Sequence, residues 1–404
     1  MDKIKRYFKG DQVIWGVLIG LMLCSIPAIY SASDSMAIAN HGGNIGAVMT
    51  RHIVLLVIGF VIVFVLHHIH YRYYRTLATV ILIISALLLL ITFFIGATIN
   101  DASRWLKIPG MGFTIQVSDI ARIGLIIFIA RELSARQNYI KDWKTGFFPI
   151  LIAVIVVAGL ILPSNFSTAG ILILTCFILM FVGSVRVIHL FLGGLIIVTC
   201  VAAFLSVTVL MGKIGIEIPS ITGRVTTWVN RVDIWNDDYD GKGDDYQREQ
   251  AYIAIATGGF LGKGPGNSTQ RALLPQSNND FIFAIIIEEY GIFGAIILLS
   301  LYTTLIVRTA MLVKKCKAIF PAFLAIGLAL NLVIPAMFNM GIAVGLLPVT
   351  GQALTLVSWG GSSLLMSCVA MGIILSISRD VERIKQISAE NTVPVNNNNE
   401  NQNG

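Results

Sequence analysis

Charged residues are scarce in this chain of 404 residues. Asp, Glu, Lys and Arg make up only 13% of the sequence, whereas hydrophobic residues make up 56%. A soluble globular domain carries about 25% charged residues, so a water-exposed surface of ordinary composition is excluded. Apolar runs of about 20 residues recur instead from end to end, and each is long enough to cross the roughly 30 Å hydrocarbon layer of a bilayer. The sequence therefore predicts an integral membrane protein.

Other missing features narrow the function. The five cysteines include no CxxC pair, which argues against a disulfide framework or a zinc site. No basic stripe interleaved with aromatic residues is present, so nucleic-acid binding is not expected. The glycine-rich turn over residues 258–268 fails the nucleotide-loop template, because Thr257 replaces the first glycine and Gly264 follows Lys263 where Ser or Thr belongs. We expect no nucleotide cofactor.

The predicted fold is all-α, with about ten transmembrane helices in a single polytopic domain over residues 1–388. If both termini are cytoplasmic, most Lys and Arg fall in short cytoplasmic connections, as the positive-inside rule requires. A large extracytoplasmic loop, about 211–280, separates helices 7 and 8, and the Asn-rich tail 389–404 is predicted to be disordered. The predicted spans are 12–32, 53–69, 76–98, 119–135, 146–162, 168–185, 187–210, 281–306, 318–340 and 361–378.

The outside segments hold several interpretable patterns. Apolar residues at helical spacing over 221–235 predict a helix that lies either in the headgroup region or on the protein's own outer face. The Asp-rich stretch 236–245 does not fit an EF-hand and is predicted to be a solvated turn. The glycine-rich turn carries Lys263 and exposed N–H groups, which are suited to cradle a pyrophosphate. Residues 341–360 hold no charge and predict a re-entrant loop.

Ionisable groups within or beside the predicted spans mark candidate functional positions, because charge is costly there. Asp280 opens the eighth span, where it is either a helix N-cap or a general base. Glu288 and Glu289 lie deeper in the same span. Adjacent positions differ by about 100° around a helix, so the two cannot point the same way and at least one needs a partner. A structural ion pair is the favoured role for each.

Further charges lie at the outer ends of other helices. Asp119 and Arg122 share one face of the fourth span, either as a plain intrahelical pair or as part of a polar cavity with Asp280. Arg51 and the pair Arg104–Trp105 are either snorkelling anchors or binders of an anionic lipid head group.

These residues carry a resemblance to a known family. Residues 262–270 (GKGPGNSTQ) and 280–291 (DFIFAIIIEEYG) resemble the pattern GxGxGNSxQK…TDFIFAxxxEExG. Residues 345–363 (GLLPVTGQALTLVSWGGSS) resemble GLLPxxGxxLPLVSYGGSS, and residues 100–122 resemble NGxxRWxxxxxxxxQPSExxK. The chain is identified on these motifs as a member of the SEDS family (shape, elongation, division and sporulation). It is closer to the division branch, FtsW, than to the elongation branch, RodA.

The resemblance implies a peptidoglycan glycosyltransferase of the bacterial cytoplasmic (inner) membrane that acts at the division septum. Such an enzyme polymerises lipid II on the extracytoplasmic side into β-1,4-linked glycan strands for cell division. An α-linked donor that gives a β bond requires inversion, for which one general base suffices; Asp280 is the candidate, and undecaprenyl pyrophosphate is the leaving group. The implied cofactor is a divalent cation, Mg or Mn, and the implied partners are a class B penicillin-binding protein and other division proteins.

The same resemblance implies the remaining site residues. Asn165, Glu288 and Glu289 are expected to have structural or cavity roles, and the metal ligands stay open. The expected substrate-binding residues are Arg51, Arg104, Trp105, Gln116, Asp119, Arg122, Lys263, Asn267, Ser268, Gln270, Asn339 and Ser358.

This sequence departs from the family pattern where Gln276 and Asn165 replace carboxylates, which weakens any metal role at those positions. Two rival functions stay open. A lipid II flippase predicts polar residues through the bilayer midplane, whereas here the polar residues gather in outside loops and at outer helix ends. A non-catalytic division scaffold predicts that Asp280→Asn leaves function intact.

Overall fold

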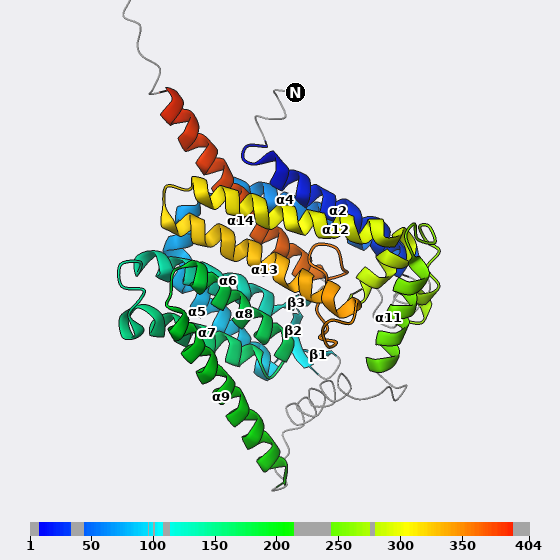
Figure 1. Cartoon of the computed structure of the whole chain (residues 1–404), viewed down its shortest axis with the longest axis horizontal. Helices are drawn as coiled ribbons and strands as arrows, with labels where there is room; N and C mark the ends of the chain where they lie inside the picture. Colours follow the sequence, from blue (N-terminus) through cyan, green and yellow to red (C-terminus); the bar gives the residue numbers. More distant parts are fainter. Residues whose placement is uncertain are drawn as a thin grey trace, which may run out of the picture.

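The computed structural model describes residues 8–33, 44–95, 97–99, 102–107, 114–213, 244–274 and 279–390. Within these residues the chain is a helical bundle and a multi-pass membrane protein (Figure 1). Eight helices are long and apolar enough to cross a membrane by length and composition, and the shorter α8 and the more polar α6 account for the remaining predicted spans. The long helices are α2 (Gln12–Ala32), α4 (Ile45–His68), α5 (Tyr71–Ile95), α6 (Val117–Ala135), α7 (Phe148–Ile161), α8 (Phe166–Val182), α9 (Val187–Lys213), α12 (Ile282–Lys315), α13 (Ile319–Ala343) and α14 (Gly361–Glu390).

The predicted spans are confirmed as helices, with differences at their ends. Helix α4 begins at Ile45, eight residues before the predicted span at 53, because Asn44 caps it by accepting from the N–H of Ala47. Helix α14 continues through Glu390 and so includes the first two residues of the predicted tail. The predictions for 221–235, for nearly all of 236–245 and for 391–404 lie outside the described residues.

A small sheet at one end of the bundle was not predicted. Strands β1 (Ala97–Ile99), β2 (Ala102–Lys107) and β3 (Thr114–Gln116) pair antiparallel in the order β1-β2-β3. Trp105 pairs with Gln116, the residue that immediately precedes α6. The sheet thereby fixes two predicted site residues side by side.

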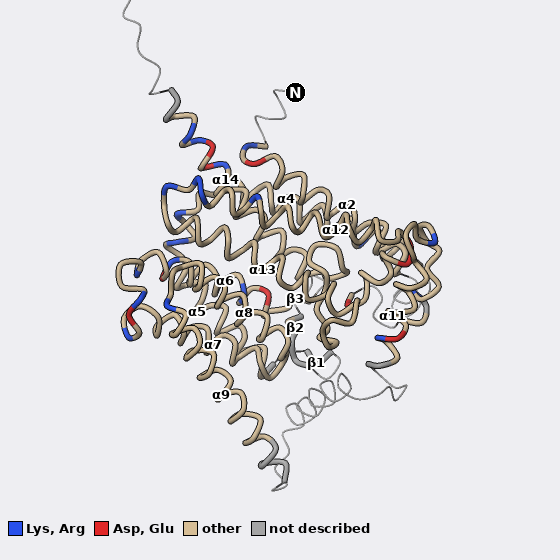
Figure 2. The backbone as a smooth tube through the Cα atoms, in the orientation of Figure 1, with Lys and Arg blue, Asp and Glu red and all other residues tan. Residues whose placement is uncertain are grey.

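The basic end of the bundle, which contains residues 8–11, the last turn of α4 and the middle of α14, holds both described ends of the chain. Lys and Arg gather there and along the adjoining helix ends (Figure 2). Polar contacts tie the segments together: Gly10 N–H donates to Glu382 Oε2 at 2.7 Å, and Arg308 lies 3.4 Å from Asp11. The opposite end, called the loop end, carries β1–β3, α11 (Asp244–Gly258) and residues 345–360.

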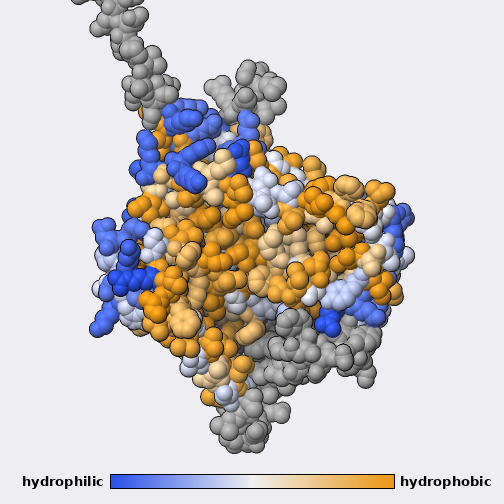
Figure 3. Space-filling view, in the orientation of Figure 1, coloured by the Kyte–Doolittle hydropathy of each residue, from blue (hydrophilic) through white to orange (hydrophobic). Residues whose placement is uncertain are grey.

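The surface of the bundle is an apolar band between hydrophilic ends (Figure 3). Among the eight helices long and apolar enough to span, α12, α13 and α14 are the most enclosed, whereas α9 runs away from the bundle (Figure 1), with only 6% of its most apolar stretch buried. Most of the buried hydrophobic side chains form one continuous core. A lipid-facing band over an enclosed helical centre is the arrangement that the hydropathy of the sequence requires.

Candidate active site

A polar cavity of about 470 Å³ lies at the loop end. Its walls come from the first turns of α6, α8 and α14, from α4 and α13, from the sheet and from the re-entrant loop, residues 345–360. Its lining is rich in amides and cations for a membrane protein. The polar and aromatic lining residues include Arg51, Trp105, Thr114, Gln116, Asp119, Arg122, Asn165, Thr168, Asn279, Asn331, Gln352 and Trp359.

Asp280 lies directly behind this lining. Its neighbour Asn279 faces the cavity, and a Cβ placed on the cavity-lining Gly351 would lie 3.4 Å from Asp280 Oδ2. The side chain is 7% exposed. The N-cap of α12 is Phe281 and not Asp280, so the N-cap interpretation of Asp280 is wrong. Its carboxylate therefore lies against the cavity wall, next to Gly351, a lining residue without a side chain.

Asn339 and Ser358 hold the backbone beside this carboxylate. Asn339 is fully buried in α13, and its Nδ2 donates to the carbonyls of Asp280 at 2.8 Å and Gln352 at 2.6 Å. Ser358 Oγ donates to the Asn279 carbonyl at 2.7 Å. Asn339 Nδ2 and Ser358 Oγ thus join the Asp280 segment to the re-entrant loop, and neither residue is among the described residues that line the cavity; their substrate contact stays a prediction.

Asp119 and Arg122 satisfy both interpretations of their spacing. The two charges are 3.7 Å apart on α6, and both line the cavity. Arg122 Nε also donates to Asn331 Oδ1 at 3.1 Å, which ties α6 to α13. Asp119 Oδ2 is buried and accepts no hydrogen bond from the described residues. Arg122 is therefore a fixed, nearly buried cation in the cavity wall.

The second cation of the lining is Arg51, near the loop end of α4. Its guanidinium lies 5.9 Å from the centre of the Trp359 ring, a cation–π arrangement. Both residues line the cavity, as do Trp105 and Gln116. The side chain of Arg104, on β2, lies outside the described residues. The predicted group Arg51, Trp105, Gln116, Asp119 and Arg122 is thus brought together in one cavity.

Two further residues complete the lining on the α8 side. Asn165 caps α8 by accepting from the N–H of Thr168 at 3.2 Å and also faces the cavity, which confirms its predicted structural and cavity role. Gln352 was missed from the sequence. Its Nε2 donates to Thr168 Oγ1 at 3.0 Å and so fastens the re-entrant loop to the start of α8. The signal available in the sequence was the Gln352 amide within an uncharged, Gly-rich segment.

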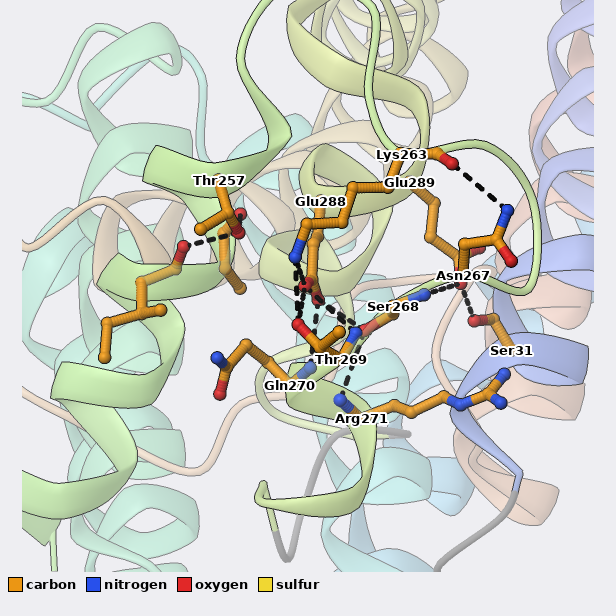
Figure 4. A network of polar contacts seen from close by, with 12 residues as sticks. Ser31, Thr257, Lys263, Asn267, Ser268, Thr269, Gln270, Arg271, Glu288 and Glu289 are labelled. Atoms are coloured by element: carbon orange, nitrogen blue, oxygen red, sulfur yellow. Dashed lines mark hydrogen bonds and ion pairs between the residues drawn. The ribbon is translucent and has the colours of Figure 1, made fainter.

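Glu288 is the centre of a separate polar cluster, outside the cavity (Figure 4). Its Oε1 forms an ion pair with Lys263 at 2.6 Å and accepts from the N–H and hydroxyl of Thr269. Its Oε2 accepts from the Ser268 hydroxyl and from the N–H of Gln270. The prediction that at least one of the paired glutamates needs a partner is confirmed. Of the ion pairs favoured for each glutamate, the described residues form the one at Glu288, whereas Glu289 has hydrogen bonds only.

Glu289 points to the other side and accepts from the Ser31 hydroxyl of α2 and from the N–H of Ser268. We call residues 258–271 the glycine-rich loop. Its N–H groups at Lys263 and Gly264 donate to the carbonyls of Glu288 and Glu289, each at 2.9 Å. The loop therefore surrounds two glutamates of its own chain.

This arrangement corrects the predicted pyrophosphate cradle. The N–H groups and the ammonium that were expected to bind phosphate oxygens are occupied by Glu288 and Glu289. Among the described residues that line the cavity, none belongs to the glycine-rich loop. Three of the predicted substrate-binding residues of this loop bind Glu288 instead: Lys263, Ser268 and Gln270. The fourth, Asn267, is exposed and donates from Nδ2 to the Lys263 carbonyl.

The fold and cavity define a class of protein: a many-helix membrane protein with a polar cavity at one end of the bundle, whose lining holds two cations. The family model described as "Cell cycle protein", FTSW_RODA_SPOVE, matches residues 11–383, and the chain belongs to this family. The chain is 30% identical over 383 residues to the "Probable peptidoglycan glycosyltransferase FtsW" of Coxiella burnetii, covering 91% of this chain and 96% of that protein.

Other relatives and solved structures are also similar to this chain over most of its length. Stage V sporulation protein E of Bacillus subtilis is 30% identical, with 90% of this chain and 96% of that protein covered. A structure titled "Structural coordination of polymerization and crosslinking by a peptidoglycan synthase complex" matches at TM-score 0.65 and 25% identity, covering 92% and 98% of the two chains. The rod shape determining protein RodA of Thermus thermophilus matches at TM-score 0.64 and 21% identity, covering 93% and 98%, which shows the shared fold.

Proposed function

We propose that this protein is a peptidoglycan glycosyltransferase that polymerises lipid II at the outer face of the bacterial cytoplasmic membrane. The names of its relatives support the activity. The observation that carries the proposal is the placement of the Asp280 carboxylate at the edge of a cavity whose lining holds two cations, Arg51 and Arg122. A base next to fixed positive charge is what an acceptor hydroxyl and a pyrophosphate leaving group require.

The proposed reaction is one inverting displacement. Asp280 accepts the proton of the acceptor's 4-hydroxyl as its oxygen attacks the anomeric carbon of the donor, and the bond to the undecaprenyl pyrophosphate oxygen breaks. Arg122, held by Asp119 and Asn331, offers a preorganised cation to the charge that develops on the leaving group. Arg51 lies over Trp359 and offers a second cation from the opposite helix α4.

A divalent cation held by the protein does not fit the described lining. Its one carboxylate is Asp119, whose Oδ1 faces the Arg122 guanidinium, and no group of three His, Cys, Asp or Glu able to hold a metal occurs among the described residues. Mg²⁺ commonly keeps waters and binds through substrate phosphates. We propose that the cation enters on the pyrophosphate of lipid II, and the roles of the side chains do not depend on it.

The membrane orientation and partners are part of the proposal. The Lys and Arg at the basic end favour a cytoplasmic position for it, which puts the cavity on the extracytoplasmic side. Membership of this family supports a place at the division septum beside a class B penicillin-binding protein and other division proteins. One solved relative is a synthase complex that couples polymerisation to crosslinking, as its title states.

The test is polymerisation of labelled lipid II by the purified protein, with and without a class B penicillin-binding protein. Wild type is expected to make glycan ladders and Asp280→Asn none, at equal thermal stability. The matched control is Asp142→Asn, which removes an exposed carboxylate at the basic end and is expected to keep full activity. Equal ladders from Asp280→Asn would remove Asp280 from the mechanism, and lipid II movement across vesicles without ladders would favour a flippase.

A further inference from the structure

A backbone break divides helix α12 into two parts, and Asp280 lies just before the first part. Helix α12 is broken at Gly291, whose φ of 64° and ψ of −160° are not helical. A side chain there is excluded, because a Cβ on Gly291 would lie 2.2 Å from the Phe260 carbonyl oxygen. Residues 282–290, which we call the outer half-helix, therefore form a short rod with Asp280 just before one end and a glycine hinge at the other.

The outer half-helix is held by apolar packing and by polar contacts at its two ends. Residues 282–287 are all buried in the hydrophobic core, because a helix of two turns and a half is not stable alone in water. At the Asp280 end, Asn339 and Ser358 hold only backbone carbonyls. At the hinge end, Glu288 takes an ammonium, two hydroxyls and two N–H groups from the glycine-rich loop. Glu289 adds the Ser31 hydroxyl of α2.

We propose that Glu288, neutralised by Lys263, is a positioning residue for Asp280. The clamp, meaning the five donors of the glycine-rich loop that bind Glu288, holds the hinge end of the outer half-helix and so sets the direction of the catalytic carboxylate beside the cavity. This inference rests on the proposed function. Glu288 is fully buried and the Lys263 side chain is 28% exposed, and neither lines the cavity. Both act through the half-helix and not on the substrate.

The ion pair between Lys263 and Glu288 makes the clamp depend on charge. Removing the Lys263 ammonium leaves the buried Glu288 carboxylate with neutral donors only, and a buried charge without a partner destabilises the structure around it. Removing the charge from both partners leaves an amide whose oxygen can accept from the N–H and hydroxyl of Thr269, while its NH2 group can donate to the Ser268 hydroxyl. Lys263→Met is therefore expected to disturb Asp280, and Lys263→Met/Glu288→Gln to restore it.

The experiment measures kcat and KM for lipid II polymerisation, normalised to folded protein, alongside hydrogen exchange of residues 279–290. We expect Lys263→Met to lower kcat at least tenfold with KM within twofold of wild type, and to speed exchange of these amides at least tenfold while α13 is unchanged. The double variant is expected to recover both to within threefold, and Lys263→Arg to remain near wild type. The control Arg136→Gln, which breaks a 2.7 Å ion pair with Glu132 at the basic end, is expected to change neither readout.

The outcomes separate the two proposals. A Lys263→Met protein with lowered thermal stability but wild-type kcat and unchanged exchange of 279–290 would overturn the positioning role. A double variant as defective as Lys263→Met would overturn the charge argument. If wild type polymerises no lipid II, the proposed function is wrong. Unchanged hydrogen exchange of residues 279–290 in Lys263→Met would then contradict the positioning role by a measurement that does not depend on activity.

Discussion

Replacing Arg122 by Leu tests how much the protein depends on one nearly buried ion pair. The side chains of Arg122 and Asp119 are 12% and 9% exposed and lie 3.7 Å apart. At that separation two unit charges attract by about 4 kcal/mol at an effective dielectric constant of about 20. Removing only the guanidinium leaves the Asp119 carboxylate buried without a cation, which typically costs about 3–5 kcal/mol. We expect Arg122→Leu to lower the free energy of unfolding by this amount.

Two companion variants separate charge from packing. Asp119→Asn/Arg122→Leu removes both charges, so it is expected to lose only about 1–3 kcal/mol, from the Arg122 hydrogen bond to Asn331. Arg136→Gln breaks a shorter but more exposed ion pair with Glu132 and is expected to cost about 1 kcal/mol or less.

The measurement is reversible unfolding of the purified protein in mixed micelles, followed by circular dichroism as denaturing detergent increases. If Arg122→Leu and Arg136→Gln lower the free energy of unfolding by the same amount within about 1 kcal/mol, burial does not make the Asp119–Arg122 pair more stabilising than the exposed pair. If the double variant is no more stable than Arg122→Leu, the cost lies in packing and not in the stranded charge.

Other variants probe the glycine hinge and the supports of the active-site backbone. Gly291→Ala is expected to lower the free energy of unfolding by several kcal/mol or prevent folding, because its φ of 64° and the nearby Phe260 carbonyl exclude a Cβ; expression and thermal melts in detergent check this. Gly170→Ala, with nothing within 4 Å of the added atom in a helix, is the control and should gain about 0.5–1 kcal/mol. Tyr302→Phe removes the hydroxyl that donates to a carbonyl of the re-entrant loop and should cost about 1–3 kcal/mol in the same melts. Asn339→Leu should lower kcat for lipid II polymerisation more than tenfold with little change in KM, and a wild-type kcat would contradict its role in holding the Asp280 carbonyl.

Hydropathy and helical spacing were enough to predict the bundle and part of the site. Long apolar runs locate the helices whatever their neighbours are, and the three-residue spacing of Asp119 and Arg122 fixes a pair by local geometry alone. The need of Glu288 or Glu289 for a partner also follows locally, because adjacent carboxylates in a span point different ways and at least one must be compensated. These predictions depend on nothing far away in the sequence.

The parts that were missed depend on distant partners. Asn339 bonds carbonyls 59 and 13 residues away, which no local pattern reveals, and it was therefore assigned to substrate. The glycine-rich loop has the composition of an anion-binding site. It does bind an anion with its N–H groups, and that anion is the Glu288 carboxylate of the same chain. The break at Gly291 lies inside one predicted span, 281–306, where hydropathy carries no information on backbone conformation.

The break in α12 also bears on how the chain enters the membrane during synthesis. A charged side chain at the centre of an inserting helix costs roughly 2.5–3.5 kcal/mol, so a 34-residue helix with two adjacent glutamates would be a poor substrate for the insertion machinery as one unit. After Gly291, residues 292–315 contain 24 residues, enough to span on their own, and they end in Lys314 and Lys315, a basic pair of the kind that the positive-inside rule places in the cytoplasm. The break thus separates this apolar span from the two glutamates, whose carboxylates bind donors of the glycine-rich loop.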